Sequence, residues 1–153
     1  MFAKKVLLIF LLFTCFKIQA QNNSSSLVIL GIAQDGGSPQ IGCDKSCCKK
    51  LWDKNLFERV TSVGLIDNIA NRFFLIDASP DITKQYQMLN SLASNATLGG
   101  IALTHAHIGH YSGLLFLGKE SLGAEKINVY SMPKMSFFLK NNGPWSQLIQ
   151  EKN

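Results

Sequence analysis

Short apolar segments alternate with polar, turn-rich segments along most of this 153-residue chain. Runs of apolar and β-branched residues bounded by Gly, Pro or Asn are typical of buried strands. The segments that fit this description are residues 27–33, 60–67, 72–77, 98–103 and 126–130. The polar residues 68–71 lie between two of these predicted strands and indicate a hairpin turn.

Other segments have helical periodicity. Pro80 can occupy the first turn of a helix, and the apolar residues that follow recur at helical spacing: Ile82, Tyr86, Leu89 and Leu92. Residues 111–118 and 133–140 are also predicted to be helical, the latter ending at an Asn-Asn-Gly-Pro sequence. Because strands alternate with helices, we expect an α/β domain in which helices cover a sheet.

The first twenty residues have a different character. Lysines within residues 1–5 precede an almost unbroken apolar run at 6–16, and the run is followed by Ile-Gln-Ala. This order predicts a secretory signal peptide at residues 1–20, a polar linker at 21–26 and one domain at 27–153.

The length of this apolar run indicates where the protein resides. It is shorter than the roughly 20 residues that a membrane-spanning helix needs, so we expect no stable membrane span after cleavage. Thr14 precedes Cys15, whereas lipoprotein cleavage sites usually have a smaller residue there, which disfavours lipidation. The prediction is a secreted or periplasmic protein.

Charge excludes one class of partner. The full chain has a formal net charge of +5, but removing residues 1–20 with their three lysines leaves 12 basic and 10 acidic side chains. Such a balance gives no electrostatic footprint for nucleic acid. The composition, 46% hydrophobic and 16% charged, is that of one globular domain.

All three histidines of the chain stand close together, at His105, His107 and His110. In an extended stretch residues i and i+2 point to the same side, so His105 and His107 can converge on one ion. A tight bend at Gly109 would bring His110 toward the same cleft. Imidazole suits zinc, and catalytic zinc commonly takes three protein ligands and keeps one position open. We therefore predict a metal site; the alternatives are histidines clustered by chance and a pH-sensitive loop.

Two segments resemble a known family. The sequence Thr-His-Ala-His-Ile-Gly-His at residues 104–110 is similar to the His-x-His-x-Asp-His signature of the metallo-β-lactamase superfamily. Residues 31–40 with the cysteines after them, and Ala-Ser-Pro-Asp at 78–81, resemble the branch that includes pyrroloquinoline quinone biosynthesis protein B. The resemblance covers nearly all of residues 27–153.

This resemblance implies roles for the histidines. His105 and His107 would bind a first zinc ion, and His110 would belong to a second site or act as an acid or base. Gly109 stands where the family has a metal-binding aspartate, so we expect the second site to be weakened and one zinc to be bound. Asp77 either orients a ligand histidine or caps the end of its strand.

The family fold implies that something is missing. It is an αββα sandwich of two similar halves, and this chain is long enough for the N-terminal half only. The family's later metal ligands have no counterpart in residues 111–153. We therefore expect a fragment or truncated frame, or a site completed by a separate half or by a second copy in a homo-oligomer.

The remaining cysteines of the predicted domain, Cys43, Cys47 and Cys48, form a second candidate site. Three thiolates could supply three ligands of a structural zinc. The related branch has a zinc-binding Cys-x-Cys-x-x-Cys cluster, but the spacing here is Cys-x-x-x-Cys-Cys. In an exported protein two of these thiols could instead form a disulfide, and free thiols are the third alternative.

Together these features predict an exported metal-dependent hydrolase that activates water against an unidentified small-molecule substrate. The alternatives are a non-hydrolytic accessory protein related to pyrroloquinoline quinone biosynthesis and an inactive half-domain.

Overall fold

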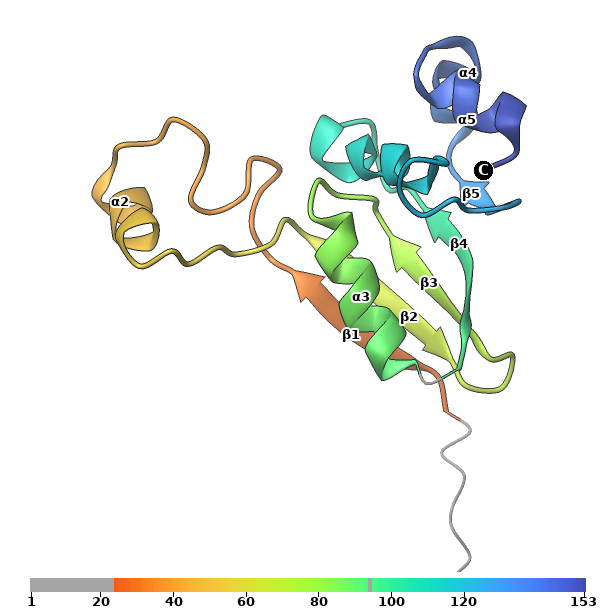
Figure 1. Cartoon of the computed structure of the whole chain (residues 1–153), viewed down its shortest axis with the longest axis horizontal. Helices are drawn as coiled ribbons and strands as arrows, with labels where there is room; N and C mark the ends of the chain where they lie inside the picture. The colour runs from red at the N-terminus through yellow and green to blue at the C-terminus, as the bar shows by residue number, and fades with distance from the viewer. Residues whose placement is uncertain (1–23, 94) are drawn as a thin grey trace, which may run out of the picture.

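A computed structural model describes residues 24–93 and 95–153. It contains a mixed five-stranded sheet in the order β1-β2-β3-β4-β5, formed by β1 (Ser26–Gly31), β2 (Ser62–Asp67), β3 (Arg72–Ile76), β4 (Thr97–Ala102) and β5 (Val129–Tyr130). The first three strands pair antiparallel, whereas β3, β4 and β5 run parallel (Figure 1). The predicted α/β fold class, a mixed sheet covered by helices, is confirmed.

The predicted signal peptide, residues 1–20, lies outside the described residues, as does the first part of the predicted linker. Within 24–93 and 95–153, no helix has the length and apolar character needed to cross a membrane.

The hairpin between β2 and β3 forms where the polar segment 68–71 predicts it. Asp67 pairs with Arg72, and the Asp67 carboxylate accepts hydrogen bonds of 3.0 Å from the backbone N–H groups of Ile69 and Ala70. Asn71 then adopts a left-handed conformation with φ 51°, which Asn tolerates better than most residues. These local contacts explain why the turn is readable from sequence.

Helix α3 (Ile82–Leu92) covers one face of the sheet (Figure 1). Leu89 is fully buried and packs on Gly64 of β2, where an added Cβ would lie 2.5 Å from a Leu89 methyl carbon. Phe73 and Ile101 are also fully buried in this core. The helix predicted to follow Pro80 is thus confirmed, and its apolar stripe provides the packing surface.

A buried glutamine ties the start of α3 to the strands. Gln85 is fully buried, its Nε2 donates to the carbonyl of Val60 at 2.7 Å, and its Oε1 accepts from the Ser79 hydroxyl at 2.7 Å. A buried polar side chain that is hydrogen-bonded in this way fixes the backbone around it. The segment from β3 into α3, which contains Asp77, is held in one place as a result.

The opposite face of the sheet is apolar and open. Val28 and Leu30 face the core, so the alternating residues Leu27 and Ile29 face the other side, where they are 71% and 61% exposed. In the pairing register Leu27 lies beside Leu65, and Leu65 beside Phe74. Apolar rows of this kind are the surface that a second layer would cover.

Residues 111–118 differ from the α-helix predicted for them. The 3₁₀ helix η2 (Ser112–Leu117) lies within this range, and a second, η1 (Ile108–His110), precedes it. The N–H of Gly113 donates to the carbonyl of Ala78 at 2.9 Å, and a Cβ added at Gly113 would clash with the carbonyl oxygen of Ser79. The 3₁₀ segment therefore packs directly on the β3–α3 loop, a tertiary contact that local periodicity does not predict.

The C-terminal region also differs in part. Helix α4 (Pro133–Asn141) matches its prediction, but β5 is only two residues long, and α5 (Trp145–Glu151) was not predicted. Lys126 has φ 55°, and its N–H donates to the carbonyl of Lys152 at 2.7 Å, so regular pairing with β4 starts later than residue 126.

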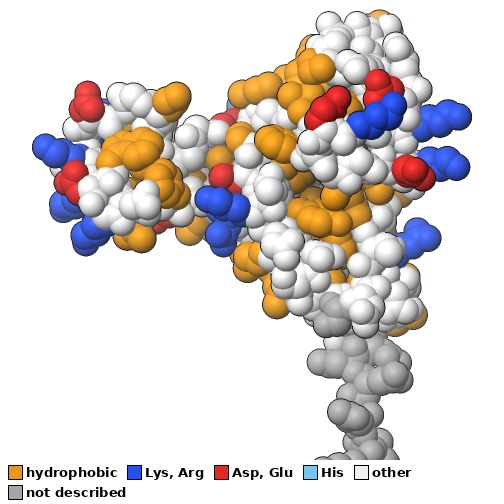
Figure 2. Space-filling view, in the orientation of Figure 1, with side chains coloured by type: hydrophobic (Ala, Val, Ile, Leu, Met, Phe, Trp, Pro, Cys, Tyr) orange, Lys and Arg blue, Asp and Glu red, His pale blue; other side chains and the backbone are white. Residues whose placement is uncertain are grey.

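Residues between β1 and β2 form a projecting arm that carries helix α2 (Ser46–Asp53), a helix not predicted from sequence. Figure 1 shows α2 standing apart from the sheet, and Figure 2 shows the arm as a separate lobe with basic side chains at its periphery. Trp52 packs edge-on against Phe57 within the arm, with ring centroids 5.5 Å apart.

Candidate metal centre

The ends of two parallel strands bring the candidate residues together. Ile76 of β3 pairs with Ala102 of β4, and the N–H of Asp77 donates to the carbonyl of Ala102 at 2.8 Å. Asp77 therefore emerges beside Thr104 at the same edge of the sheet. In open α/β sheets, ligands bind outside the carboxyl ends of the strands. A functional site is therefore expected at this edge of the sheet.

Asp77 connects the two chain segments at this edge. Its carboxylate accepts from the N–H of Thr104 at 2.8 Å and from the Thr104 hydroxyl, and its Oδ2 lies 2.7 Å from Nδ1 of His110. Asp77 is 4% exposed and has a left-handed φ of 66°, a conformation that Asp tolerates better than most residues. Its contacts match both roles considered from sequence, histidine orientation and capping. Its part in function stays a prediction.

The three imidazole rings lie side by side. The ring centroids of His105 and His110 are 4.0 Å apart, and those of His105 and His107 are 4.6 Å apart. Nδ1 of His105 is 2.9 Å from the Thr104 hydroxyl. The side chain of His110 is 10% exposed, whereas that of His107 is 74% exposed. We call His105, His107 and His110 the histidine site.

A carboxylate that was not singled out from sequence faces the histidine site. Asp35, in the loop after β1, has its Oδ1 3.1 Å from Nε2 of His110 and its Oδ2 3.6 Å from Nδ1 of His107. Asp35 directly precedes the glycine-rich turn at residues 36–39, and the sequence analysis assigned its carboxylate no role. An acidic residue in a turn directly after a buried strand is the signal that could have indicated it.

His110 is held between two carboxylates. Burial of the ring lowers the pKa of His110. Its hydrogen bonds to Asp77 and Asp35, together with the negative charges of these two carboxylates, have the larger effect, with Asp77 contributing more. The pKa of His110 is therefore raised above its usual value. In the metal-free chain His110 therefore keeps its proton to a higher pH than an unperturbed histidine does.

The donor set fits a zinc ion. Metal-ligating histidines usually engage a carboxylate, carbonyl or water with their other ring nitrogen, which fixes the ring. His110 has Asp77 in that position, and His105 has the Thr104 hydroxyl. Neutral imidazole and carboxylate are both zinc ligands. The histidine nitrogens are nevertheless not closed into a tight set: of the described residues, the group whose ligand atoms all lie within 4.8 Å of one another is the cysteine trio.

The cysteine trio lies in the arm. Cys43 and Cys48 form a disulfide, and Cys47 is free and exposed. The three sulfur atoms also lie close enough to share one ion. A disulfide uses two of the thiolates that a zinc site would need, so these arrangements belong to different redox states of the same cluster.

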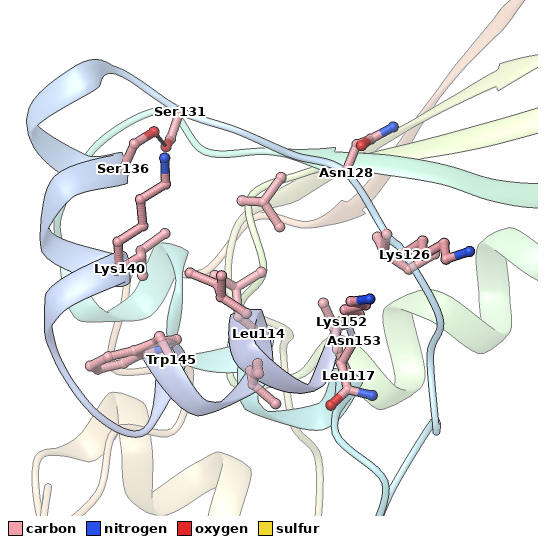
Figure 3. A pocket seen from close by; sticks show the side chains of 15 residues that line it. Leu114, Leu117, Lys126, Asn128, Ser131, Ser136, Lys140, Trp145, Lys152 and Asn153 are labelled. Atoms are coloured by element: carbon pink, nitrogen blue, oxygen red, sulfur yellow. Dashed lines mark hydrogen bonds between the residues drawn. The ribbon is translucent and has the colours of Figure 1, made fainter.

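A cavity of about 340 Å³ lies elsewhere, between η2, β5 and the C-terminal helices. Figure 3 shows Lys140 reaching toward the hydrogen-bonded pair Ser131 and Ser136, with Lys126 and Lys152 on the other side. Its lining has no histidine, cysteine or acidic side chain. The cavity therefore offers neither the ligands nor the acid–base groups found at the histidine site.

Comparison with known proteins decides the family. A model of the Beta-lactamase superfamily domain matches residues 72–152, which include the histidine site and Asp77. The chain belongs to the β-lactamase superfamily. The superfamily resemblance inferred from the His-x-His-x-Gly-His segment is thereby confirmed.

Relatives confirm the branch as well. This superfamily member is 28% identical over 132 residues to the coenzyme PQQ synthesis protein B of Methylorubrum extorquens, a match covering 82% of this chain and 43% of the relative. It is 34% identical over 96 residues to the protein of the same name from Klebsiella pneumoniae, covering 58% and 31%. The chain thus spans less than half the length of these relatives.

Solved structures agree on the fold. The crystal structure of Zn(2+)-bound PqqB from Methylobacterium extorquens superposes with a TM-score of 0.69 at 24% identity, covering 84% of this chain and 47% of that one. A diphosphatase from the PhnP family has a TM-score of 0.56 at 26% identity, covering 76% and 44%. The fold is therefore about half of a metallo-β-lactamase sandwich, which explains the open apolar face of the sheet.

Proposed function

We propose that this protein is a metal-dependent hydrolase whose histidine site holds a zinc ion. The observation that carries the proposal is the set of adjacent imidazoles at the carboxyl end of β4, with Nδ1 of His110 anchored by Asp77 at 2.7 Å. Superfamily membership supports it independently.

Each residue at the histidine site has a proposed role. His105 and His107 hold the ion, and His110 either holds it too or moves a proton as an acid or base. Thr104 and Asp77 fix the rings of His105 and His110 through the contacts described above. When bound, zinc lowers the pKa of water toward neutrality and polarises the bond under attack.

The proposed substrate is a small molecule with a hydrolysable ester, lactam or phosphodiester bond. The similarity to a diphosphatase of the PhnP family favours a phosphorus-containing substrate among these classes. The chain spans less than half the length of its relatives. We propose that metal binding needs this half alone, and turnover that appears only on self-association would show that a second copy completes the site.

The experiment first measures bound zinc and then hydrolysis. The purified chain is analysed for bound zinc and assayed on ester, lactam and phosphodiester substrates, alone and at increasing protein concentration to detect activity that depends on self-association. His105→Ala combined with His107→Ala should remove the zinc bound at this site. Asp53→Asn, an exposed change in the arm, should leave it in place. A folded parent protein that binds no metal here would overturn the proposal.

A second candidate function is supported by the names of the relatives. They are coenzyme PQQ synthesis proteins, and this chain would then bind metal or a small molecule in quinone-cofactor synthesis without hydrolysing it. Zinc bound at the histidine site without turnover of any of the three substrate classes, even at high protein concentration, would favour this candidate.

We also propose that the protein is exported, with residues 1–20 as the signal peptide. The support is the order of lysines, apolar run and small residues in the sequence. Mass spectrometry of the protein recovered from the periplasm or medium should show a new N-terminus near residue 21. Recovery of the uncleaved chain from the cytoplasm would contradict export.

A further inference from the structure

Gly109 and Asp35 are in direct contact although they come from distant parts of the chain. A Cβ added at Gly109 would lie 2.6 Å from Cβ and 2.7 Å from Cα of Asp35. The φ of Gly109 lies outside the left-handed region, so its backbone conformation does not require glycine. What requires glycine at 109 is the space that Asp35 occupies.

The carboxylate of Asp35 reaches into the histidine site from this position. Its two oxygens face different rings, Oδ1 toward His110 at 3.1 Å and Oδ2 toward His107 at 3.6 Å. On His110 it faces Nε2, the nitrogen that Asp77 leaves free. The side chain is 39% exposed, so it borders the open side of the site and is not enclosed behind it.

The loop that carries Asp35 is anchored on both sides. Before it, the N–H of Ala33 donates to the carbonyl of Arg59 at 2.9 Å, and the N–H of Thr61 donates to the carbonyl of Ala33 at 2.8 Å. After it, the N–H of Glu58 donates to the carbonyl of Ser38 at 2.7 Å. These contacts hold the carboxylate at the histidine site by backbone hydrogen bonds.

Other nearby carboxylates are committed elsewhere. Asp77 accepts from Thr104 and lies behind His110, and Asp81 accepts from the N–H of Val60 at 2.8 Å. Asp35 is thus the carboxylate positioned to add an anionic donor to the imidazoles. Zinc binds carboxylate oxygen as well as imidazole nitrogen.

We propose that Asp35 is a metal ligand of the histidine site, supplying from the loop after β1 the carboxylate that residue 109 lacks. Gly109 is then a positioning residue, because it leaves room for the Asp35 loop to approach. This inference rests on the proposed function, since it requires a metal at the histidine site.

The first test measures zinc affinity by calorimetry in a Cys47→Ser background, which removes the free thiol of the arm. Asp35→Asn keeps the shape of the side chain and removes its charge. We expect zinc affinity to fall by more than about 10-fold, since even partners outside the ligand shell contribute that much. Asp53→Asn is the matched control with the same chemical change in the arm, and it should bind zinc like the background.

The second test asks whether position 35 touches the metal. In the same background, Asp35→Cys places a thiol there, and cobalt(II) is added as the probe. A thiolate-to-cobalt absorption band is expected for Asp35→Cys and not for Asp53→Cys. Circular dichroism checks that each variant is folded, and if Asp35→Cys is not, the zinc affinity of Asp35→Asn decides the question.

The outcomes separate the two proposals. If the background protein binds no metal and His105→Ala changes nothing, the proposed function fails. If it binds metal through His105 but Asp35→Asn binds equally well, or a folded Asp35→Cys gives no band, only the role of Asp35 is overturned.

Discussion

Oδ2 of Asp77 lies 2.7 Å from Nδ1 of His110, and both side chains are buried. The pair links the end of β3 to the loop after β4 across 33 positions of sequence. It fixes which nitrogen of His110 faces the open side of the site. The electrostatics of the histidine site can be tested through this one contact.

Asp77→Asn should lower the pKa of His110 in the metal-free protein, because it removes the buried negative charge that stabilises the imidazolium. The measurement is an NMR titration of the His110 ring in the presence of a chelator. Asp53→Asn serves as the control. An unchanged His110 pKa in a folded Asp77→Asn protein would mean that Asp35 alone maintains it.

The same contact gives stability a defined pH dependence. The pKa of His110 is raised in the folded state, so its contribution is fully present below the unfolded-state pKa and is lost as pH rises through the folded-state pKa. We expect the metal-free parent to lose stability to urea across this window and Asp77→Asn to lose less. Urea denaturation curves at a series of pH values give the free energy of unfolding as a function of pH. The same change of this free energy with pH in both proteins would contradict the prediction.

Gly109→Ala should weaken zinc binding although it removes no ligand. The added methyl group meets the backbone and Cβ of Asp35, so the loop must shift and withdraw its carboxylate. Calorimetry in the Cys47→Ser background should show a loss of about 10-fold or more. Combining Gly109→Ala with Asp35→Asn should add little further loss, because both act through one carboxylate. Fully additive losses would argue against this coupling.

The contact between Asp35 and His110 could not be predicted from the sequence, whereas most of the local elements could. Strands β1 to β4, the hairpin and α3 follow from local periodicity and turn chemistry, and each was predicted within a few residues. The histidine site could also be predicted, because its three histidines lie within six residues of one another in the sequence. Asp35 meets His110 across 75 positions of sequence, and such a contact depends on how the β1 loop folds over the sheet edge. The 3₁₀ conformation of residues 112–117 was also missed, in a segment that packs on the distant β3–α3 loop through the hydrogen bond from Gly113 to Ala78.

The packing of α3 on the sheet should dominate the stability of the domain. The side chain of Leu89 is completely buried in the core, whereas that of Leu92 in the same helix is 54% exposed to solvent. Leu89→Ala should therefore lower the free energy of unfolding by about 2–5 kcal/mol. Leu92→Ala, the matched control, should change it by about 0.5 kcal/mol or less. Similar losses at both positions in urea denaturation would show that α3 does not pack as described.

The cysteine trio should bind zinc only when reduced. The sulfur atoms of Cys43, Cys47 and Cys48 lie within 4.8 Å of one another, so a reductant that opens the Cys43–Cys48 disulfide leaves three thiols that one ion can bridge. In a His105→Ala, His107→Ala background, which disables the histidine site, the reduced protein should take up zinc and the oxidised protein should not. Cys47→Ser removes one of the three donors without touching the disulfide, and it should weaken uptake by the reduced protein. Equal zinc uptake before and after reduction would mean that the thiols are not the ligands, and the arm would then be stabilised by its disulfide alone.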